Sequence, residues 1–119
     1  MKHYRIATIP GDGIGVGTTI EAVETLQAVC RAHGGIKLTF EEYPWGCKYY
    51  LQHGEMMPAD GLRILGDYDS ILFGAVGFPS VPDHISLWGL LLPIRQGFDQ
   101  YINLRPVRLL AGIPGPLRD

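Results

Sequence analysis

Two arginines near the carboxyl-terminal end of the chain, Arg95 and Arg105, have side chains well suited to bind a dicarboxylic acid. A guanidinium group is planar and can donate two parallel hydrogen bonds to one carboxylate. On one continuous helix, ten residues would separate the two arginines by about 15 Å and by roughly 80° around the axis. They can share a ligand only if the chain reverses, for example from a helix over 94–101 into a strand over 102–110. Separate surface salt bridges, to acidic residues such as Asp99, are the alternative.

A run of glycines follows the first apolar segment, in the sequence Ile9-Pro-Gly-Asp-Gly-Ile-Gly15. Glycines between a strand and a helix lie at the edge of an α/β sheet where ligands bind, and the start of the helix attracts anions. The dinucleotide-binding pattern G-x-G-x-x-G fails, because its last position falls on Val16 if it begins at Gly11 and on Thr18 if it begins at Gly13. An ordinary Rossmann domain is therefore not supported. Taken alone, the glycines also fit a tight turn that binds nothing.

Other residues carry weaker signals. Asp67 and Asp69 could contact a hard cation, but without a further ligand nearby they are typical of a solvated turn. His53 and His84 have no partner Ser, Cys or metal cluster at a recognisable spacing, so neither is a candidate base. Trp88 could pack in the core or form the wall of a ligand site, and its position in the sequence does not decide between them.

Composition and charge exclude several classes of function. The chain has 119 residues, of which 46% are hydrophobic and 18% charged, as expected for one soluble globular domain. The formal net charge is -2 and the basic residues are scattered, so neither nucleic acid nor an anionic membrane is an expected partner. No segment resembles a signal peptide or a membrane span, and a cytoplasmic protein is expected. Cys30 and Cys47 lack metal-ligand spacing and are expected to be reduced.

Hydrophobic periodicity predicts alternating strands and helices. Strands are expected over 4–10, 36–43, 70–76 and 102–110, helices over 16–33 and 94–101, and a short helix after Pro58 through Leu65. The apolar face of the first helix should be formed by Val16, Ile20, Val23, Leu26 and Cys30. The segment from Gly77 to Asp83 contains two prolines and should form a stiff loop, a kind of segment that often carries function. This alternation indicates an α/β fold with a largely parallel sheet flanked by helices.

Four motifs taken together resemble the isocitrate and isopropylmalate dehydrogenase family in order and spacing. They are the glycine turn 9–15, Gly74-Ala-Val-Gly77, Leu91-Leu-Pro-Ile-Arg95 and Asn103-Leu-Arg-Pro106, and the match covers essentially the whole chain. The resemblance implies the amino-terminal part of that family's own two-domain α/β fold, which is not a Rossmann domain. It also implies an NAD-dependent oxidoreductase that oxidises C2 of a 2-hydroxy dicarboxylic acid and then releases the β-carboxylate. Mn²⁺ or Mg²⁺ would polarise the C2 oxygen, and potassium is a further candidate ion.

Within the family, the stretch Val81–Gly89 is similar to the tartrate and D-malate dehydrogenases. Isopropylmalate dehydrogenases usually have Glu and small or apolar residues here, whereas the indole of Trp88 would fill the space that a branched C3 substituent needs. The expected substrate is therefore tartrate or D-malate, with 3-isopropylmalate as the alternative. By the same resemblance, Arg95, Arg105 and Trp88 would contact the substrate. The residues implied to contact the nicotinamide half of NAD are Gly13, Ile14, Phe78, Pro79, Ser86 and Leu87.

The resemblance also implies residues that lie outside this sequence. In the family, the third substrate arginine, the Tyr and Lys acid–base pair, the metal-binding aspartates and the adenine-binding loop all follow the matched region. No catalytic or metal-ligating residue is therefore assigned within 1–119. We expect residues 1–119 to be a single amino-terminal α/β segment of a larger, homodimeric dehydrogenase, and to be inactive alone. A truncated, non-catalytic module that binds a dicarboxylate is the second hypothesis.

Overall fold

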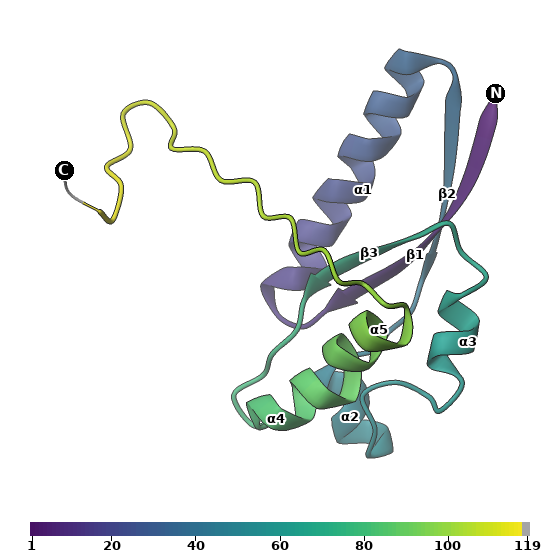
Figure 1. Ribbon diagram of the computed structural model, residues 1–119, viewed down its shortest axis with the longest axis vertical. Helices are drawn as coiled ribbons and strands as arrows, with labels where there is room; N and C mark the ends of the chain where they lie inside the picture. The colour runs from purple at the N-terminus through teal and green to yellow at the C-terminus, as the bar shows by residue number, and fades with distance from the viewer. Residues whose placement is uncertain (118–119) are drawn as a thin grey trace.

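The computed structural model, which describes residues 1–117, contains a three-stranded parallel sheet with helices on both faces (Figure 1). The strands are β1 (Lys2–Gly11), β2 (Ile36–Glu42) and β3 (Ser70–Ala75), in the order β2-β1-β3. The helices are α1 (Ile14–His33), α2 (Cys47–His53), α3 (Gly61–Leu65), α4 (Asp83–Ser86), the π-helical turn η1 (Leu87–Leu91) and α5 (Leu92–Gly97). The predicted α/β class with a parallel sheet flanked by helices is confirmed.

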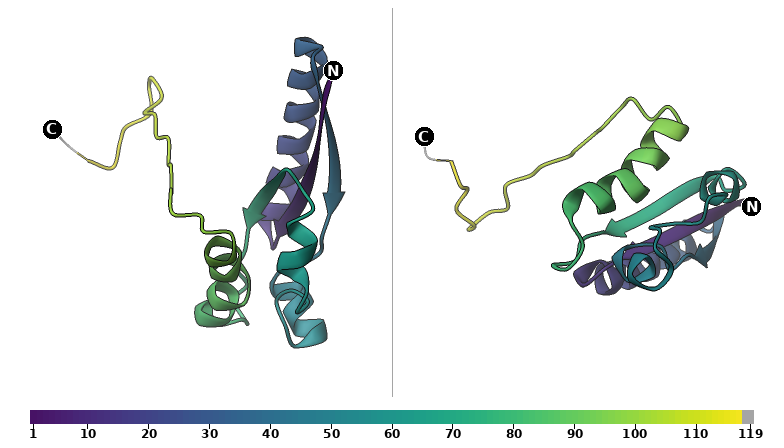
Figure 2. Two further views of the ribbon diagram at one scale, coloured as in Figure 1. Left: turned by 45° about the vertical axis from the view of Figure 1, so that its right-hand side comes forward. Right: turned by 90° about the horizontal axis from the view of Figure 1, so that it is seen from below.

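The two faces of the sheet are covered by different helices. Neighbouring residues of a strand point to opposite faces, and β3 shows this directly. Phe73 faces α5, whereas a Cβ atom added to Gly74 would lie 2.6 Å from the Thr19 Oγ1 atom of α1. The helix formed by α4, η1 and α5 runs alongside β3 on the side away from α1 (Figure 2). The hydrophobic core lies on that side and contains Ala7, Ile9, Trp45, Cys47, Met56, Leu65, Val81, Leu90 and Ile94.

Helix α1 contacts the sheet through small residues. Gly15 and Thr19 are buried, whereas Val16 and Ile20 are 46% and 52% exposed. A Cβ atom added to Gly15 would lie 2.5 Å from the carbonyl oxygen of Ala75, so only glycine allows the first turn of the helix to approach β3 this closely. The helix itself was predicted correctly from its apolar repeat. The choice of its buried face was wrong at Val16 and Ile20, because the close approach at Gly15 rotates them outward.

The helix that was predicted over 94–101 begins earlier in the structure, at Asp83, and also ends earlier, at Gly97. Three consecutive helical segments run from Asp83 to Gly97, with the π-helical turn η1 in the middle. At its end the backbone N–H of Leu92 donates to the carbonyl oxygen of Leu87, five residues earlier, and Pro93 follows at once. Proline has no N–H and its ring collides with the carbonyl group four residues before it. The wider turn accommodates Pro93 without ending the helix.

The prediction of a strand over 102–110 was wrong. The chain from Gln100 to Leu110 has no helix or strand, and it leads away from the sheet (Figure 1). Leu104 and Val107 are 85% and 93% exposed. A β-branched, apolar composition favours a strand only where another strand can pair with it, and within residues 1–117 none pairs with this segment. The reversal that was expected to bring Arg105 beside Arg95 is therefore not formed.

Candidate active site

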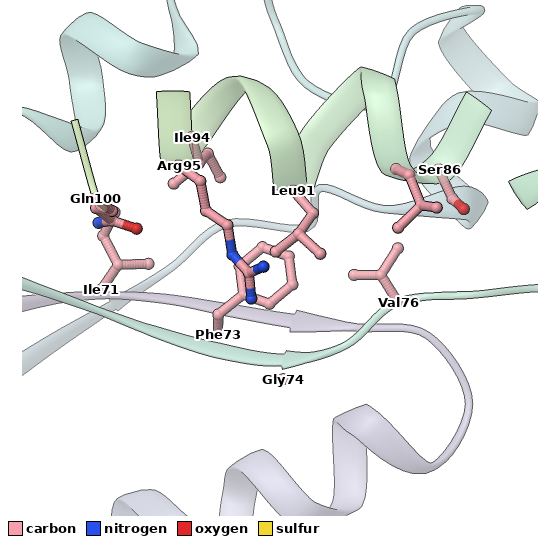
Figure 3. Close-up of a pocket in the computed structure, with 10 residues that line it drawn as sticks. Ile71, Phe73, Gly74, Val76, Ser86, Leu91, Ile94, Arg95 and Gln100 are labelled. Carbon is pink, nitrogen blue, oxygen red and sulfur yellow. The ribbon is translucent and has the colours of Figure 1, made fainter. Parts of the chain in front are cut away.

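A groove lies between β3 and the helix from Asp83 to Gly97 (Figure 3). Its volume is about 410 Å³. The residues that line it are Ile71, Phe73, Gly74, Val76, Ser86, Leu87, Leu91, Ile94, Arg95 and Gln100. The walls are mainly aliphatic, and the polar groups come from the helix and from Gln100. The groove can therefore hold a small molecule that is in part apolar and carries at least one hydrogen-bonding group.

Arg95 is the charged residue of this groove. Its side chain extends from α5 toward β3, and its guanidinium group lies near Phe73 (Figure 3). Within residues 1–117 the guanidinium group has no ion pair and no hydrogen bond to another side chain. A guanidinium group beside apolar walls is stabilised by an anion, and a carboxylate fits its paired donors best. This part of the predicted substrate site can therefore bind one carboxylate.

Arg105 and Trp88 lie apart from this groove. Arg105 is exposed in the chain that follows Gln100, so the structure does not bring the two arginines together. Trp88 is 63% exposed and lines a separate pocket with His84 and Met56. In a regular α-helix, residues seven apart such as 88 and 95 would lie about 20° from each other. The π-helical turn between them adds a residue to the turn and separates the two side chains.

The residues expected to contact NAD fall into two neighbouring groups. Ser86 and Leu87 line the groove, and Ser86 lies at the end opposite Gln100 (Figure 3). Gly13, Ile14, Phe78 and Pro79 lie after the carboxyl-terminal ends of β1 and β3, which are adjacent strands. Ile14 is 81% exposed and Phe78 is 47% exposed, so both side chains are accessible to a ligand. The structure therefore brings the glycine turn and the loop after β3 to one edge of the sheet.

Asp12 joins the glycine turn to that loop and was missed by the sequence analysis. Its backbone N–H donates to the Ala75 carbonyl oxygen at 2.7 Å, and its buried carboxylate accepts a hydrogen bond from the Gly77 N–H at 3.2 Å. The same carboxylate accepts hydrogen bonds from the N–H groups of Cys47 and Lys48, at the start of α2. An aspartate between two glycines at the end of a buried strand was the signal available in the sequence.

The buried thiol of Cys47 lies beside this carboxylate. Burial, followed by hydrogen bonding to Asp12, raises the pKa of Cys47 from 9.0 to about 11. We expect Cys30, which is partly exposed, to be alkylated by iodoacetamide first. Cys47 should react about a hundredfold more slowly than an ordinary thiol from its lower thiolate fraction alone. Peptide mass spectrometry after timed alkylation measures both rates, with urea-unfolded chain as the control. Equal rates for the two cysteines in the folded chain would contradict this assignment.

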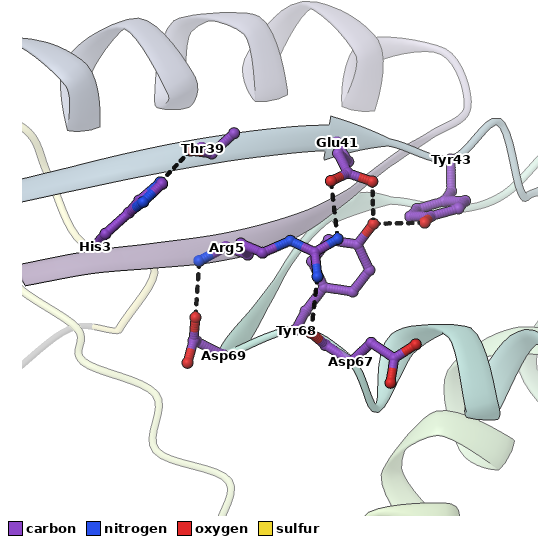
Figure 4. A network of polar contacts seen from close by, with 8 residues as sticks. All are labelled: His3, Arg5, Thr39, Glu41, Tyr43, Asp67, Tyr68 and Asp69. Carbon is purple, nitrogen blue, oxygen red and sulfur yellow. Dashed lines mark hydrogen bonds and ion pairs between the residues drawn. The ribbon is translucent and has the colours of Figure 1, made fainter.

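A polar network ties β1 and β2 to the turn before β3 (Figure 4). Arg5 forms an ion pair with Glu41 at 3.0 Å, and its cation lies 4.6 Å from the centre of the Tyr68 ring. The Tyr68 hydroxyl donates to Glu41 and also contacts the Tyr43 hydroxyl at 2.6 Å. Asp69, which was expected in a solvated turn, accepts a hydrogen bond from the Arg5 backbone N–H at 2.8 Å. These contacts hold the sheet together away from the groove.

The network predicts a pH dependence of stability. Hydrogen bonding from Tyr68, and then from Arg5, holds the pKa of Glu41 below its ordinary value of 4.5. The folded state therefore favours the ionised carboxylate of Glu41. The stability that this carboxylate contributes is fully present above pH 4.5, and it is lost as the pH falls through the lower pKa of the folded state. Urea unfolding at several pH values, on the unmodified chain and on Glu41→Gln, measures this pH dependence. The difference between their free energies of unfolding should shrink on acidification, and a constant difference would contradict the assignment.

The part of the chain that the structure describes contains neither a metal-binding cluster nor a helix that could span a membrane. Within residues 1–117, no group of three or more His, Cys, Asp or Glu side chains is placed to hold a metal ion. Among the helices of the same residues, none has the length and apolar character needed to cross a lipid bilayer.

Comparison with known proteins places the chain in a family. The family model for isocitrate/isopropylmalate dehydrogenase matches residues 5–119. The chain is 54% identical, over all its 119 residues, to a probable tartrate dehydrogenase/decarboxylase of Agrobacterium vitis. It is 56% identical over 119 aligned residues, 98% of the chain, to the decarboxylating D-malate dehydrogenase of Escherichia coli (strain K12). In both cases the match spans 33% of the relative, so the chain is about a third as long as these relatives.

A solved structure supports the same assignment. The apo crystal structure of a β-decarboxylating dehydrogenase from Thermococcus kodakarensis superposes with a TM-score of 0.61 at 31% sequence identity. The superposition covers 82% of this chain and 27% of the other. The four motifs, the parallel α/β fold and the family-model match over almost every residue agree with one another. The chain belongs to the isocitrate/isopropylmalate dehydrogenase family.

Proposed function

We propose that this chain forms part of the active site of an NAD-dependent dehydrogenase that oxidises and decarboxylates a small 2-hydroxy dicarboxylic acid. The observation that carries the proposal is the position of Arg95. Its guanidinium group lies in a groove with mainly aliphatic walls and has no ion pair within residues 1–117. One carboxylate of the substrate would bind there, with its carbon skeleton against Leu87 and Leu91.

NAD would lie at the neighbouring edge of the sheet. The glycine turn and the loop after β3 meet there, and the groove reaches this edge through Val76 and Ser86. Gly13, Ile14, Phe78 and Pro79 would contact the nicotinamide half of the dinucleotide, next to the substrate in the groove. When bound, NAD would accept the hydride from C2 of the hydroxyacid.

The remaining parts of the site would come from outside this sequence. We propose that residues 1–119 are the amino-terminal α/β part of a longer, homodimeric cytoplasmic dehydrogenase. The metal ligands, for Mn²⁺ or Mg²⁺, and the acid–base residues would then follow the matched region, as would any potassium site. The strand expected over 102–110 would form in that longer chain once a partner strand is present, and Arg105 would then approach the groove.

Tartrate and D-malate are the proposed substrates. Likeness to relatives named for these two substrates, at 54% and 56% identity, supports this choice. Trp88 does not line the groove that holds Arg95, so its proposed role in excluding a branched C3 substituent stays a prediction.

The test is an assay of the polypeptide encoded by the complete reading frame. The codons after Asp119 are read first, to establish whether the other family motifs are encoded. NADH formation is then measured with Mn²⁺ and K⁺ on D-malate, tartrate and 3-isopropylmalate in parallel. We expect turnover with D-malate or tartrate, and little with 3-isopropylmalate. Preference for 3-isopropylmalate would overturn the substrate assignment, and failure to reduce NAD with all three would overturn the proposed function.

A further inference from the structure

The carboxylate of Asp12 connects three segments that are far apart in the sequence. The side chain is buried, with 6% of its surface exposed. Its Oδ2 atom accepts hydrogen bonds from the backbone N–H groups of Cys47 at 3.0 Å and of Gly77 at 3.2 Å. Its Oδ1 atom accepts a hydrogen bond from the N–H of Lys48 at 3.2 Å. The glycine turn, the start of α2 and the loop after β3 therefore meet at one carboxylate.

This environment requires a carboxylate and accepts few substitutes. All three hydrogen-bond partners are donors, so both oxygen atoms must accept. An asparagine would offer one acceptor and turn an NH₂ group toward backbone N–H groups. Within residues 1–117 no cationic side chain pairs with Asp12, and its charge is stabilised by these N–H groups together with the neighbouring Cys47 thiol. Gly46 contributes by its size, because a Cβ atom there would lie 3.2 Å from both carboxylate oxygen atoms.

We propose that Asp12 is a positioning residue, whose carboxylate holds the loop from Gly77 to Val81 in place beside the glycine turn. The start of this loop is fixed at two points, by the Asp12 N–H on the Ala75 carbonyl and by the Asp12 carboxylate on the Gly77 N–H. The backbone N–H of Val81 donates a hydrogen bond to the carbonyl oxygen of Phe78 at 2.9 Å, and this bond closes the loop into a turn. On the proposed function, this loop contacts the nicotinamide half of NAD. Asp12 would thus preorganise the NAD site without touching NAD.

The anchoring is tested first on this chain, without any cofactor. Amide hydrogen exchange is measured by NMR on the unmodified chain, on Asp12→Asn, and on Asp83→Asn as a control. Asp83 is exposed at the start of α4, near the other end of the loop, and its substitution removes the same charge. We expect exchange at Gly77 and Cys47 to accelerate at least about tenfold in Asp12→Asn, with β1 amides unchanged. Unchanged exchange at Gly77 in a folded Asp12→Asn chain would overturn the proposal.

A second measurement needs no variant and applies even if Asp12→Asn does not fold. In the unmodified chain, the Gly77 amide, whose hydrogen-bond acceptor is Asp12, should exchange with solvent at least about tenfold more slowly than the amide of the exposed Gly13. Exchange at Gly77 as fast as at Gly13 would overturn the anchoring.

The link to NAD is tested separately, on the product of the complete reading frame. Asp12→Asn should raise the KM for NAD at least about tenfold and change the KM for the hydroxyacid less than about twofold, whereas Asp83→Asn should change neither. If exchange at Gly77 accelerates but the KM for NAD does not change, the positioning role is overturned while the proposed function stands. If the unmodified protein does not reduce NAD, the proposed function fails, and the exchange data still decide whether Asp12 anchors the loop.

Discussion

Replacing Gly11 with alanine should destabilise the fold by more than about 3 kcal/mol. Gly11 ends β1 with a φ of 79°, a left-handed conformation that favours glycine. A Cβ atom added there would also lie 2.1 Å from the carbonyl oxygen of Ala75, which is backbone and cannot move aside as a side chain would. The turn would have to separate from β3, and the hydrogen bond between the Asp12 N–H and Ala75 would be lost.

Gly54, at the end of α2, provides the matched control for this substitution. Its φ is 78°, so alanine meets a similar conformational cost, but no heavy atom lies within 4 Å of the added Cβ. Gly54→Ala should therefore cost only about 1 kcal/mol. Urea denaturation followed by circular dichroism gives both free energies of unfolding. An equal loss of unfolding free energy in the two variants would show that the close contact between the glycine turn and β3 is not formed.

Replacing Arg95 with glutamine should weaken binding of the hydroxyacid about a hundredfold, through the loss of about 3 kcal/mol of charged hydrogen bonding. The guanidinium group is the charged group of the groove, and glutamine removes the charge while keeping a polar side chain. In steady-state kinetics on the complete reading-frame product, the KM for the hydroxyacid should rise and the KM for NAD should change little. Lysine at this position should restore only part of the affinity, because it lacks the paired donors.

Arg63→Gln is the control for Arg95. Arg63 is an exposed arginine that pairs with Asp60 at 2.9 Å on the surface, away from the groove. Its substitution removes the same charge and should leave both KM values unchanged. A similar rise in KM for the two variants would mean that the effect comes from net charge, and that Arg95 does not bind the substrate directly.

The strands and the first helix could be predicted from the sequence because their signal is local. Alternating or continuous apolar residues marked β1, β2 and β3 to within two residues at each end. The start of the helix at Asp83 was missed because Gly89 and Pro93 both act as helix breakers in most sequences. Here a π-helical turn accommodates Pro93. Glycine at position 89 allows Met56 to pack closely, since a Cβ atom there would lie 2.6 Å from the Met56 Cγ atom.

The candidate site could be predicted only in part, because much of it depends on contacts between distant residues. The meeting of the glycine turn with the loop after β3 was implied by the family resemblance, which placed both segments beside the nicotinamide half of NAD, and the structure brings them together. The role of Asp12 depends on partners 35 and 65 residues away, which no local pattern reveals. The relative orientation of Trp88 and Arg95 was hidden for a different reason, since the π-helical turn changes the angle that a regular helix would give.

We propose that Arg95 binds one carboxylate of the substrate, and that Arg105 joins it on the same diacid in the complete protein. A double-mutant cycle tests this most directly, with D-malate affinity measured by calorimetry for the unmodified protein, Arg95→Gln, Arg105→Gln and the double variant. Each single substitution should weaken binding, and the two effects should be coupled by more than about 1 kcal/mol because both groups hold one ligand. Unchanged affinity in Arg95→Gln, or independent effects of the two substitutions, would contradict the account.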